Sequence, residues 1–134
     1  MKKDYSKIFN HPMFGEVRTV VNGDEIRVCL MDVCKALGLQ AKHVIERLDK
    51  GTVLRGPLIT AGGVQQANFV NEEGLYEVIF QSRKPIAKDF RKWVMSEVLP
   101  SIPNYRAVRI TLNDKEYFNG IPFFCYIYNV HVHN

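Results

Sequence analysis

The chain has 134 residues, of which 46% are hydrophobic and 24% are charged, a composition typical of one ordinary folded domain with a modest core. Its net charge of +4 mildly favours polyanionic partners. No segment approaches the ~20 apolar residues of a membrane span, and no signal-peptide-like run follows the first lysines, so a membrane partner is excluded and a cytoplasmic location is expected.

A β-hairpin is predicted near the N-terminus. Residues 14–21 and 24–30 alternate apolar and polar side chains, and Asn22-Gly23 between them suits a two-residue type I′ turn. In that register one face is apolar and buried, while Arg18 lies opposite Arg27 on the other face. We expect neighbouring glutamates to screen this like-charge pair, and a bound phosphate is the less favoured alternative.

The next segment has a pattern typical of a helix-turn-helix. Asp32 is predicted to cap a helix near residues 32–37, Gly38 to allow a tight turn, and a second helix to span residues 40–49. A plain helical hairpin in the core is the alternative. The second helix would direct four side chains toward a DNA major groove: Gln40, Lys42, His43 and Arg47. The arginine and the glutamine suit base edges, and the lysine would contact phosphate.

Residues 50–70 carry a weaker pattern. Glycines bracket short β-like runs at residues 52–54 and 58–60, ahead of a third run at residues 67–70. We expect strands joined by a loose loop. Residues 61–66 would form a tip whose glutamines reach a partner, although a tolerated surface loop is the favoured interpretation.

Two helix signatures and a dense basic cluster follow. Asn71 is predicted to cap a helix over residues 72–82, and Pro85 to lie in the first turn of a helix over residues 85–99. One face of this second helix is apolar. The opposite face and the preceding turn carry five basic residues: Arg83, Lys84, Lys88, Arg91 and Lys92. Such a stripe can neutralise phosphates by releasing counterions, and an ordinary solvated face is the alternative.

Together these elements predict an α+β fold, in which a small antiparallel sheet built on the N-terminal hairpin packs with about four helices, including the helix-turn-helix-like pair. The expected core comprises Leu37, Val44, Leu75, Ile79, Phe90 and Trp93.

Three segments in register resemble one known family. They are IFNHPMFGEVRTV at residues 8–20, VCLMDVCKALGL at residues 28–39, and FVNEEGLY with SRKPIAKDFRKWVMSEVLPSI up to residue 102. The sequence resembles the BRO family N-terminal (Bro-N) domain of baculovirus repeated-ORF proteins and prophage antirepressors, over residues 8–102. The resemblance implies a DNA-binding or regulatory module of viral or prophage origin, usually fused to a variable C-terminal domain and without enzymatic chemistry of its own.

Residues 103–134 form a tail that the resemblance does not reach. Residues 108–112 and 116–118 are predicted to pair as a hairpin around Asn113-Asp114. The uncharged, aromatic-rich run at residues 123–130 must be buried or paired. The sequence leaves three alternatives for it: an added strand, a dimer contact, or a truncated or frameshifted reading frame.

Catalysis and cofactors are not expected. Cys29, Cys34 and Cys125 match no zinc module, so we interpret them as reduced packing residues and expect no metal or other cofactor. No residue has a recognisable nucleophile context, and the acids are better explained as helix caps or surface charges. No catalytic residue is assigned, and a metal-dependent nuclease is the least favoured alternative.

Two functions remain. One is a transcription regulator that binds duplex DNA through basic helix faces. The other is an interaction module that sequesters a phage or host repressor without binding DNA. A homo-oligomer is compatible with both.

Overall fold

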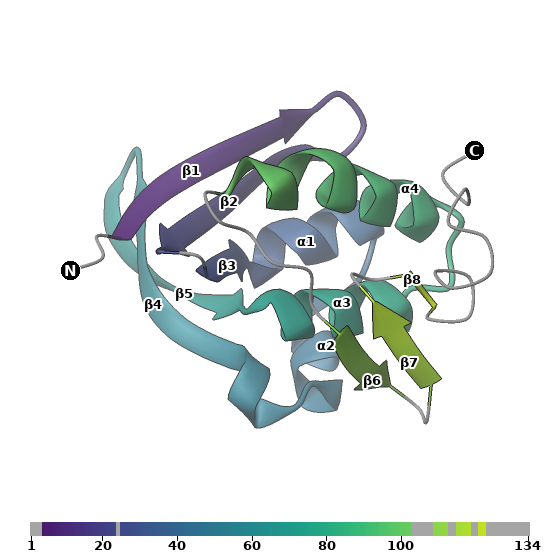
Figure 1. The fold of residues 1–134 in the computed structure, drawn as a ribbon. Helices are drawn as coiled ribbons and strands as arrows, with labels where there is room; N and C mark the ends of the chain where they lie inside the picture. Colours follow the sequence, from purple (N-terminus) through teal and green to yellow (C-terminus); the bar gives the residue numbers. More distant parts are fainter. Residues whose placement is uncertain (1–3, 24, 103–108, 113–114, 119–120, 123–134) are drawn as a thin grey trace.

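The computed structural model describes residues 4–23, 25–102, 109–112, 115–118 and 121–122. In this part of the chain, five strands form one antiparallel sheet in the order β1-β2-β3-β5-β4, and helices pack against one face of it (Figure 1). The strands are β1 (Asp4–His11), β2 (Gly15–Asn22), β3 (Glu25–Cys29), β4 (Val53–Thr60) and β5 (Gly63–Val70). The predicted α+β class is therefore confirmed.

The helices are α1 (Leu30–Leu37), α2 (Ala41–Arg47), α3 (Glu72–Gln81) and α4 (Ile86–Trp93). A π-helical segment (Val94–Val98) and a 3-10 turn (Leu99–Ser101) extend α4, and another 3-10 turn (Lys50–Thr52) precedes β4. A three-stranded sheet follows, with β6 (Arg109–Leu112), β7 (Lys115–Phe118) and β8 (Ile121–Pro122). None of the described helices combines the length and apolar character that crossing a lipid bilayer requires.

Strand β1 is missing from the sequence-based prediction. It pairs with β2 along its whole length, from Asp4 opposite Asn22 to His11 opposite Gly15. Its sequence, DYSKIFNH, has neither a strict alternation nor a continuous apolar run, so no period of two marks it as a strand. As an edge strand it pairs on one side only, which relaxes the demand for apolar side chains.

The predicted hairpin forms, but its register differs from the prediction. Asn22 pairs with Glu25, so the two-residue loop begins at Gly23, which has a φ of 65°. Arg27 lies opposite Val20 instead of Arg18, and the predicted like-charge pair is wrong. Because side chains alternate with a period of two, this two-residue change of partner leaves the same face apolar and buried.

Strands β4 and β5 form one long hairpin, and the predicted loose loop is wrong. Each strand has eight residues, and pairing runs from Val53 opposite Val70 to Thr60 opposite Gly63. The tip is residues 61–62 alone. Pro57 interrupts the strand pattern in the sequence, yet an edge strand tolerates proline because one side of its backbone needs no partner.

Helix α1 begins at Leu30, two residues earlier than predicted, and Asp32 does not cap it. The carboxylate instead receives two hydrogen bonds from the Arg18 guanidinium, at 2.8 Å from Nε and 2.7 Å from Nη2, and a third from the Arg18 backbone N–H at 2.9 Å. This ion pair joins α1 to β2. The sequence missed it because the partners lie 14 residues apart on different elements.

The remaining helices follow the prediction closely. Asn71 caps α3, and its Oδ1 accepts a hydrogen bond from the Gly74 N–H at 2.8 Å. Pro85 is the N-cap residue of α4 instead of a residue in its first turn. All six predicted core side chains are buried.

Cys29 and Cys34 are free and buried, as predicted, and burial raises the pKa of the Cys34 thiol to about 11. In the tail, β6 and β7 pair with Leu112 opposite Lys115, so the predicted hairpin around Asn113-Asp114 is confirmed. Cys125 and residues 123–130 lie outside the described residues.

Gly74 in α3 leads to a stability prediction. A Cβ added there would lie 2.8 Å from Thr52 Cβ and 3.1 Å from the Thr52 carbonyl oxygen, so the alanine methyl does not fit without movement of the backbone. Gly74→Ala is therefore expected to lower the free energy of unfolding by about 1–3 kcal/mol, although alanine usually stabilises a helix relative to glycine by roughly 1 kcal/mol. Urea denaturation measures the change.

The matched control is Gly56→Ala, because a Cβ at Gly56 meets no atom within 4 Å. That control should change the stability by no more than about 0.5 kcal/mol. A Gly74→Ala variant as stable as the parent chain would show that the α3 packing against Thr52 is looser than described.

Candidate nucleic-acid interface

Four cationic side chains gather where α3 meets α4. They line a shallow groove of about 280 Å³ whose apolar lining includes Ile79 and Ala87. Residues three and four apart share one side of a helix, which is why α4 presents cations here while Phe90 and Trp93 face the core. The cations of this groove, which we call the basic groove, are Arg83, Lys84, Lys88 and Arg91.

Lys84 connects the basic groove with the turn between α1 and α2. Its Nζ donates a hydrogen bond to the Gly38 carbonyl oxygen at 3.4 Å. Gly38 has a φ of 68°, which glycine adopts without strain, and a Cβ there would lie 2.5 Å from the Lys84 ammonium. A cation at the C-terminal end of α1 also complements the helix dipole. The turn of the helix pair and the start of α4 are thus held together.

Some of the cations in and beside the basic groove have no carboxylate partner. Within the described part of the chain, Arg83, Lys88 and Lys92 form no ion pair with a carboxylate. Asp89 is the single acid among residues 83–92. An excess of positive charge on a fixed helix face is the arrangement that attracts a phosphate backbone.

The helix pair itself is confirmed, with α1 and α2 joined through the left-handed Gly38. All four residues predicted to point outward from the second helix are exposed: Gln40, Lys42, His43 and Arg47. Gln40 is the N-cap residue of α2, and its side chain forms no capping hydrogen bond. These side chains are free to contact a partner.

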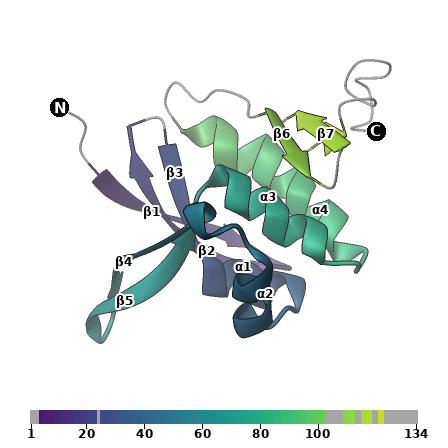
Figure 2. The ribbon, with the colours of Figure 1, turned by 90° about the horizontal axis from the view of Figure 1, so that it is seen from below.

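The predicted site residues therefore fall into two groups. One group lines the basic groove, with Lys92 exposed on α4 beside it, and the other lies on α2. Figure 2 shows α1 and α2 between the β4–β5 hairpin on one side and α3 with α4 on the other. The contact of Lys84 with Gly38 is the described link between the two groups.

A cleft beside α2 is lined by polar residues of the β4–β5 hairpin, among them the two glutamines that the sequence places in a tip reaching a partner. It has a volume of about 210 Å³ and lies between the β4–β5 hairpin and the junction of β3 with α1, at residues 29–31, with Ala41 at the start of α2 also in its lining. Arg55 on β4 pairs with Asn68 on β5, and its Nη1 donates a hydrogen bond to Asn68 Oδ1 at 3.2 Å. No local sequence signal joins these two residues, because only the strand register brings them together. We call this the α2–hairpin cleft.

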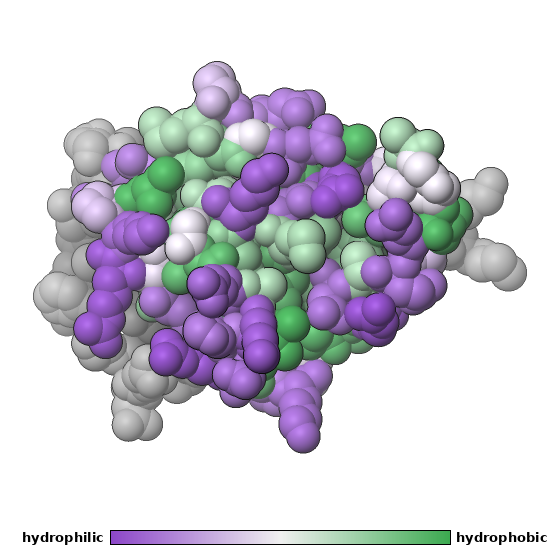
Figure 3. All heavy atoms as spheres, turned by 180° about the vertical axis from the view of Figure 1, so that it is seen from behind, coloured by the Kyte–Doolittle hydropathy of each residue, from purple (hydrophilic) through white to green (hydrophobic). Residues whose placement is uncertain are grey.

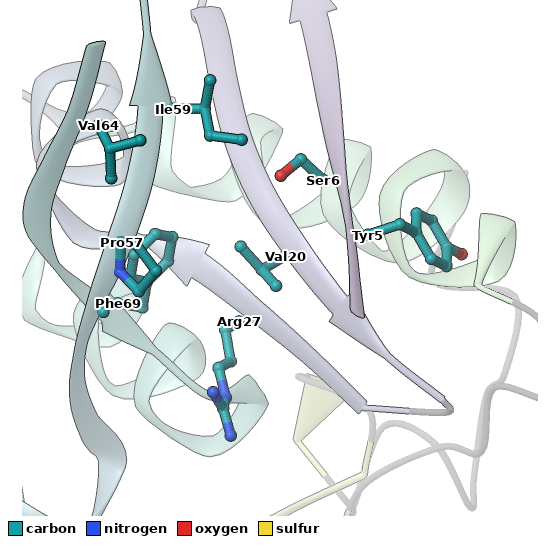
Figure 4. A pocket seen from close by; sticks show the side chains of 9 residues that line it. Tyr5, Ser6, Val20, Arg27, Pro57, Ile59, Val64 and Phe69 are labelled. Atoms are coloured by element: carbon teal, nitrogen blue, oxygen red, sulfur yellow. The ribbon is translucent and has the colours of Figure 1, made fainter. Parts of the chain in front are cut away.

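A wider concavity of about 540 Å³ lies on the outer face of the sheet (Figure 4). A cross-strand row of Ser6, Val20 and Arg27 lines it, together with hairpin residues that include Ile59 and Val64. Arg27 is the single cation among its lining residues, so this concavity does not suit a polyanion. The surface seen from behind is mostly hydrophilic, with smaller apolar areas between the polar side chains (Figure 3).

In the described part of the chain, no group of three or more histidine, cysteine, aspartate or glutamate side chains is placed to hold a metal ion. The buried thiols are poor nucleophiles, because burial raises the pKa of both Cys29 and Cys34.

Comparisons with known proteins give a family and two relatives. The family described as BRO family, N-terminal domain, matches residues 16–100. An uncharacterized protein of Haemophilus influenzae is 39% identical over 80 residues, which cover 58% of this chain and 40% of the relative. A protein of Invertebrate iridescent virus 6, named as Bro-N domain-containing protein 289L, is 32% identical over 131 residues, covering 81% of this chain and 31% of the relative.

The chain thus spans less than half the length of each of these relatives. No solved structure matches it.

Proposed function

The chain belongs to the BRO family, whose N-terminal domain it matches over residues 16–100, and on that basis we propose that it is a DNA-binding regulatory module of prophage or viral type. In this proposal it is antirepressor-like and binds duplex DNA through its basic helix faces.

The basic groove is the observation that carries the proposal. Arg83, Lys84, Lys88 and Arg91 line one depression instead of being dispersed. Packing of α3 and α4 on the core holds the backbone of these residues in place, so little order must be gained on binding. Contacts of this kind to phosphate oxygens position a protein on a duplex without reading its sequence.

The exposed face of α2 supports the same proposal. In helix-turn-helix proteins the second helix enters the major groove, and its first residues contact base edges. Gln40 and Arg47 have the side-chain groups that form paired hydrogen bonds with adenine and guanine. Lys42 would contact phosphate, and His43 lies exposed beside it.

A protein-interaction module that sequesters a repressor without binding DNA is the second candidate. The hairpin favours it, because Ile59 and Val64 form an exposed cross-strand apolar pair with 72% and 67% of their surfaces accessible. Exposed apolar side chains that line a concavity are typical of protein contact sites.

A titration of a short, random-sequence duplex at two ionic strengths tests the proposal. If the basic groove neutralises about three phosphates, affinity should fall roughly 40-fold when salt rises about fourfold, since each contact contributes about 0.9 to the salt slope. Fluorescence anisotropy of labelled duplex gives the dissociation constants. Absence of binding at low salt, together with a stable complex with a phage or host repressor, would favour the second candidate.

A further inference from the structure

The β4–β5 hairpin separates from the rest of the sheet beside the α2–hairpin cleft. Strand β3 pairs with β5 at two positions only, Val28 opposite Val70 and Cys29 opposite Phe69. Beyond Cys29 the chain turns into α1, whereas β5 still has six residues on the other side of Phe69. The hairpin therefore extends past β3 as a two-stranded arm (Figure 2). The cleft lies between this arm and the residues that begin α1 and α2.

The polar groups of the cleft are mostly neutral amides. Gln65, Gln66 and Asn68 come from β5, and Arg55 comes from β4. Among the described residues, Gln65 and Gln66 have no side-chain hydrogen-bond partner, and Arg55 has no carboxylate partner. The bond from Arg55 Nη1 to Asn68 Oδ1 leaves the Asn68 amide N–H groups and the rest of the guanidinium able to donate.

The charge distribution separates this cleft from the basic groove. Residues 56–70, which form most of the hairpin, include no charged side chain. Arg18 also lines the cleft, but Asp32 neutralises its guanidinium. With Arg55 as the one uncompensated cation, the cleft suits a ligand that offers hydrogen-bonding edges better than one that offers several phosphates.

We propose that the α2–hairpin cleft reads base edges of duplex DNA, while the basic groove holds the phosphate backbone. This inference rests on the proposed function and assigns a sequence-reading role to Arg55, Gln66 and Asn68, whose side chains share one face of the hairpin. The major groove admits a two-stranded antiparallel ribbon as well as a helix. Arginine matches guanine, and glutamine and asparagine match adenine, through paired hydrogen bonds.

The position of the cleft agrees with this division of roles. Gly38, which accepts the hydrogen bond from Lys84, is three residues before Ala41, which lines the cleft. The α3–α4 pair, the α1–α2 pair and the β4–β5 hairpin follow one another across the molecule (Figure 2). A duplex that contacts the first can reach the last along the same surface.

The test begins by selecting the preferred duplex of the parent chain from a random-sequence pool. The ratio of its affinity to that of random duplex is then measured for the parent and for the double variant Gln66→Ala/Asn68→Ala, which changes one face of the hairpin. We expect this ratio to fall at least about tenfold in the variant, since each lost paired contact costs discrimination. The affinity for random duplex and its salt slope should stay unchanged, because no charge is removed.

The matched control is Asn10→Ala, which removes an exposed amide from β1, away from the cleft. It should keep the full affinity ratio, and circular dichroism verifies that each variant is folded.

An unchanged ratio in the cleft variant, or a parent chain that binds DNA without any sequence preference, overturns the inference and leaves the proposed function standing. If the parent chain binds no DNA, both the inference and the proposed function are wrong. Loss of repressor binding in the cleft variant, without loss of DNA preference, would assign the cleft to a protein ligand instead.

Discussion

Replacing Asp32 by alanine is expected to lower the free energy of unfolding by about 3 kcal/mol or more. The carboxylate is 7% exposed and accepts three hydrogen bonds from Arg18, two of them from the guanidinium. Its removal leaves a partly buried guanidinium and a backbone N–H without their partner, and the cost of unpaired buried groups exceeds the net value of the pair. For a domain whose total stability is on the order of 5–15 kcal/mol, this is a large fraction.

Denaturant unfolding of Asp32→Ala, Arg18→Met and the double variant measures the effect and its origin. The double variant should be less destabilised than the sum of the two single variants, because neither partner is then left alone. Asp89→Ala, which removes an exposed acid from α4, is the control and should cost no more than about 0.5 kcal/mol. Additive single-variant effects would mean that the two side chains do not depend on each other.

The Arg18 charge itself does not titrate in this comparison. The hydrogen bond from the guanidinium to Asp32 raises the pKa of Arg18 above its usual value, so the arginine stays charged at any pH used for unfolding. The stability contribution of the pair therefore depends on the carboxylate being present and not on the protonation of its partner.

Removing two charges from the basic groove, with Arg83→Gln/Lys88→Gln, is expected to weaken binding to random duplex by roughly 10-fold or more at about 0.1 M salt. The slope of log affinity against log salt should decrease in magnitude by about 1.8, since each lost phosphate contact contributes about 0.9. Both side chains are exposed and form no ion pair in the described structure, so their replacement should leave the fold intact. Anisotropy titrations at several salt concentrations provide both quantities.

The control removes the same charge from the sheet, with Lys7→Gln/Arg27→Gln. Lys7 lies on the edge strand β1, and Arg27 lines the concavity on the outer face of the sheet. This variant should keep most of the affinity and the salt slope of the parent chain. Equal losses in the two double variants would mean that net charge, and not the basic groove, drives the binding.

Local patterns in the sequence were sufficient for the elements that carry their own signals. The β2–β3 hairpin, the Asn71 cap of α3 and the two-faced α4 all form, because alternation, capping and helical spacing act between residues that are near neighbours in the chain. The same patterns correctly assigned buried faces even where the strand register was wrong. Strand β1 was not predicted, because its apolar and polar residues do not alternate with the period of two that marks a strand.

Contacts between distant residues decided the rest. The Arg18–Asp32 ion pair, the full length of the β4–β5 hairpin and the Arg55–Asn68 pair depend on how separate elements meet in space.

The amino-acid sequence alone determined the family, the α+β class, the core and the cationic face of α4, since backbone geometry dictates which side of each element its residues occupy. Only the packed structure brought four of the cations into one groove and placed neutral amides beside α2. The direction in which one element crosses another is set by the fit of many side chains at once, and no short stretch of the chain encodes that fit.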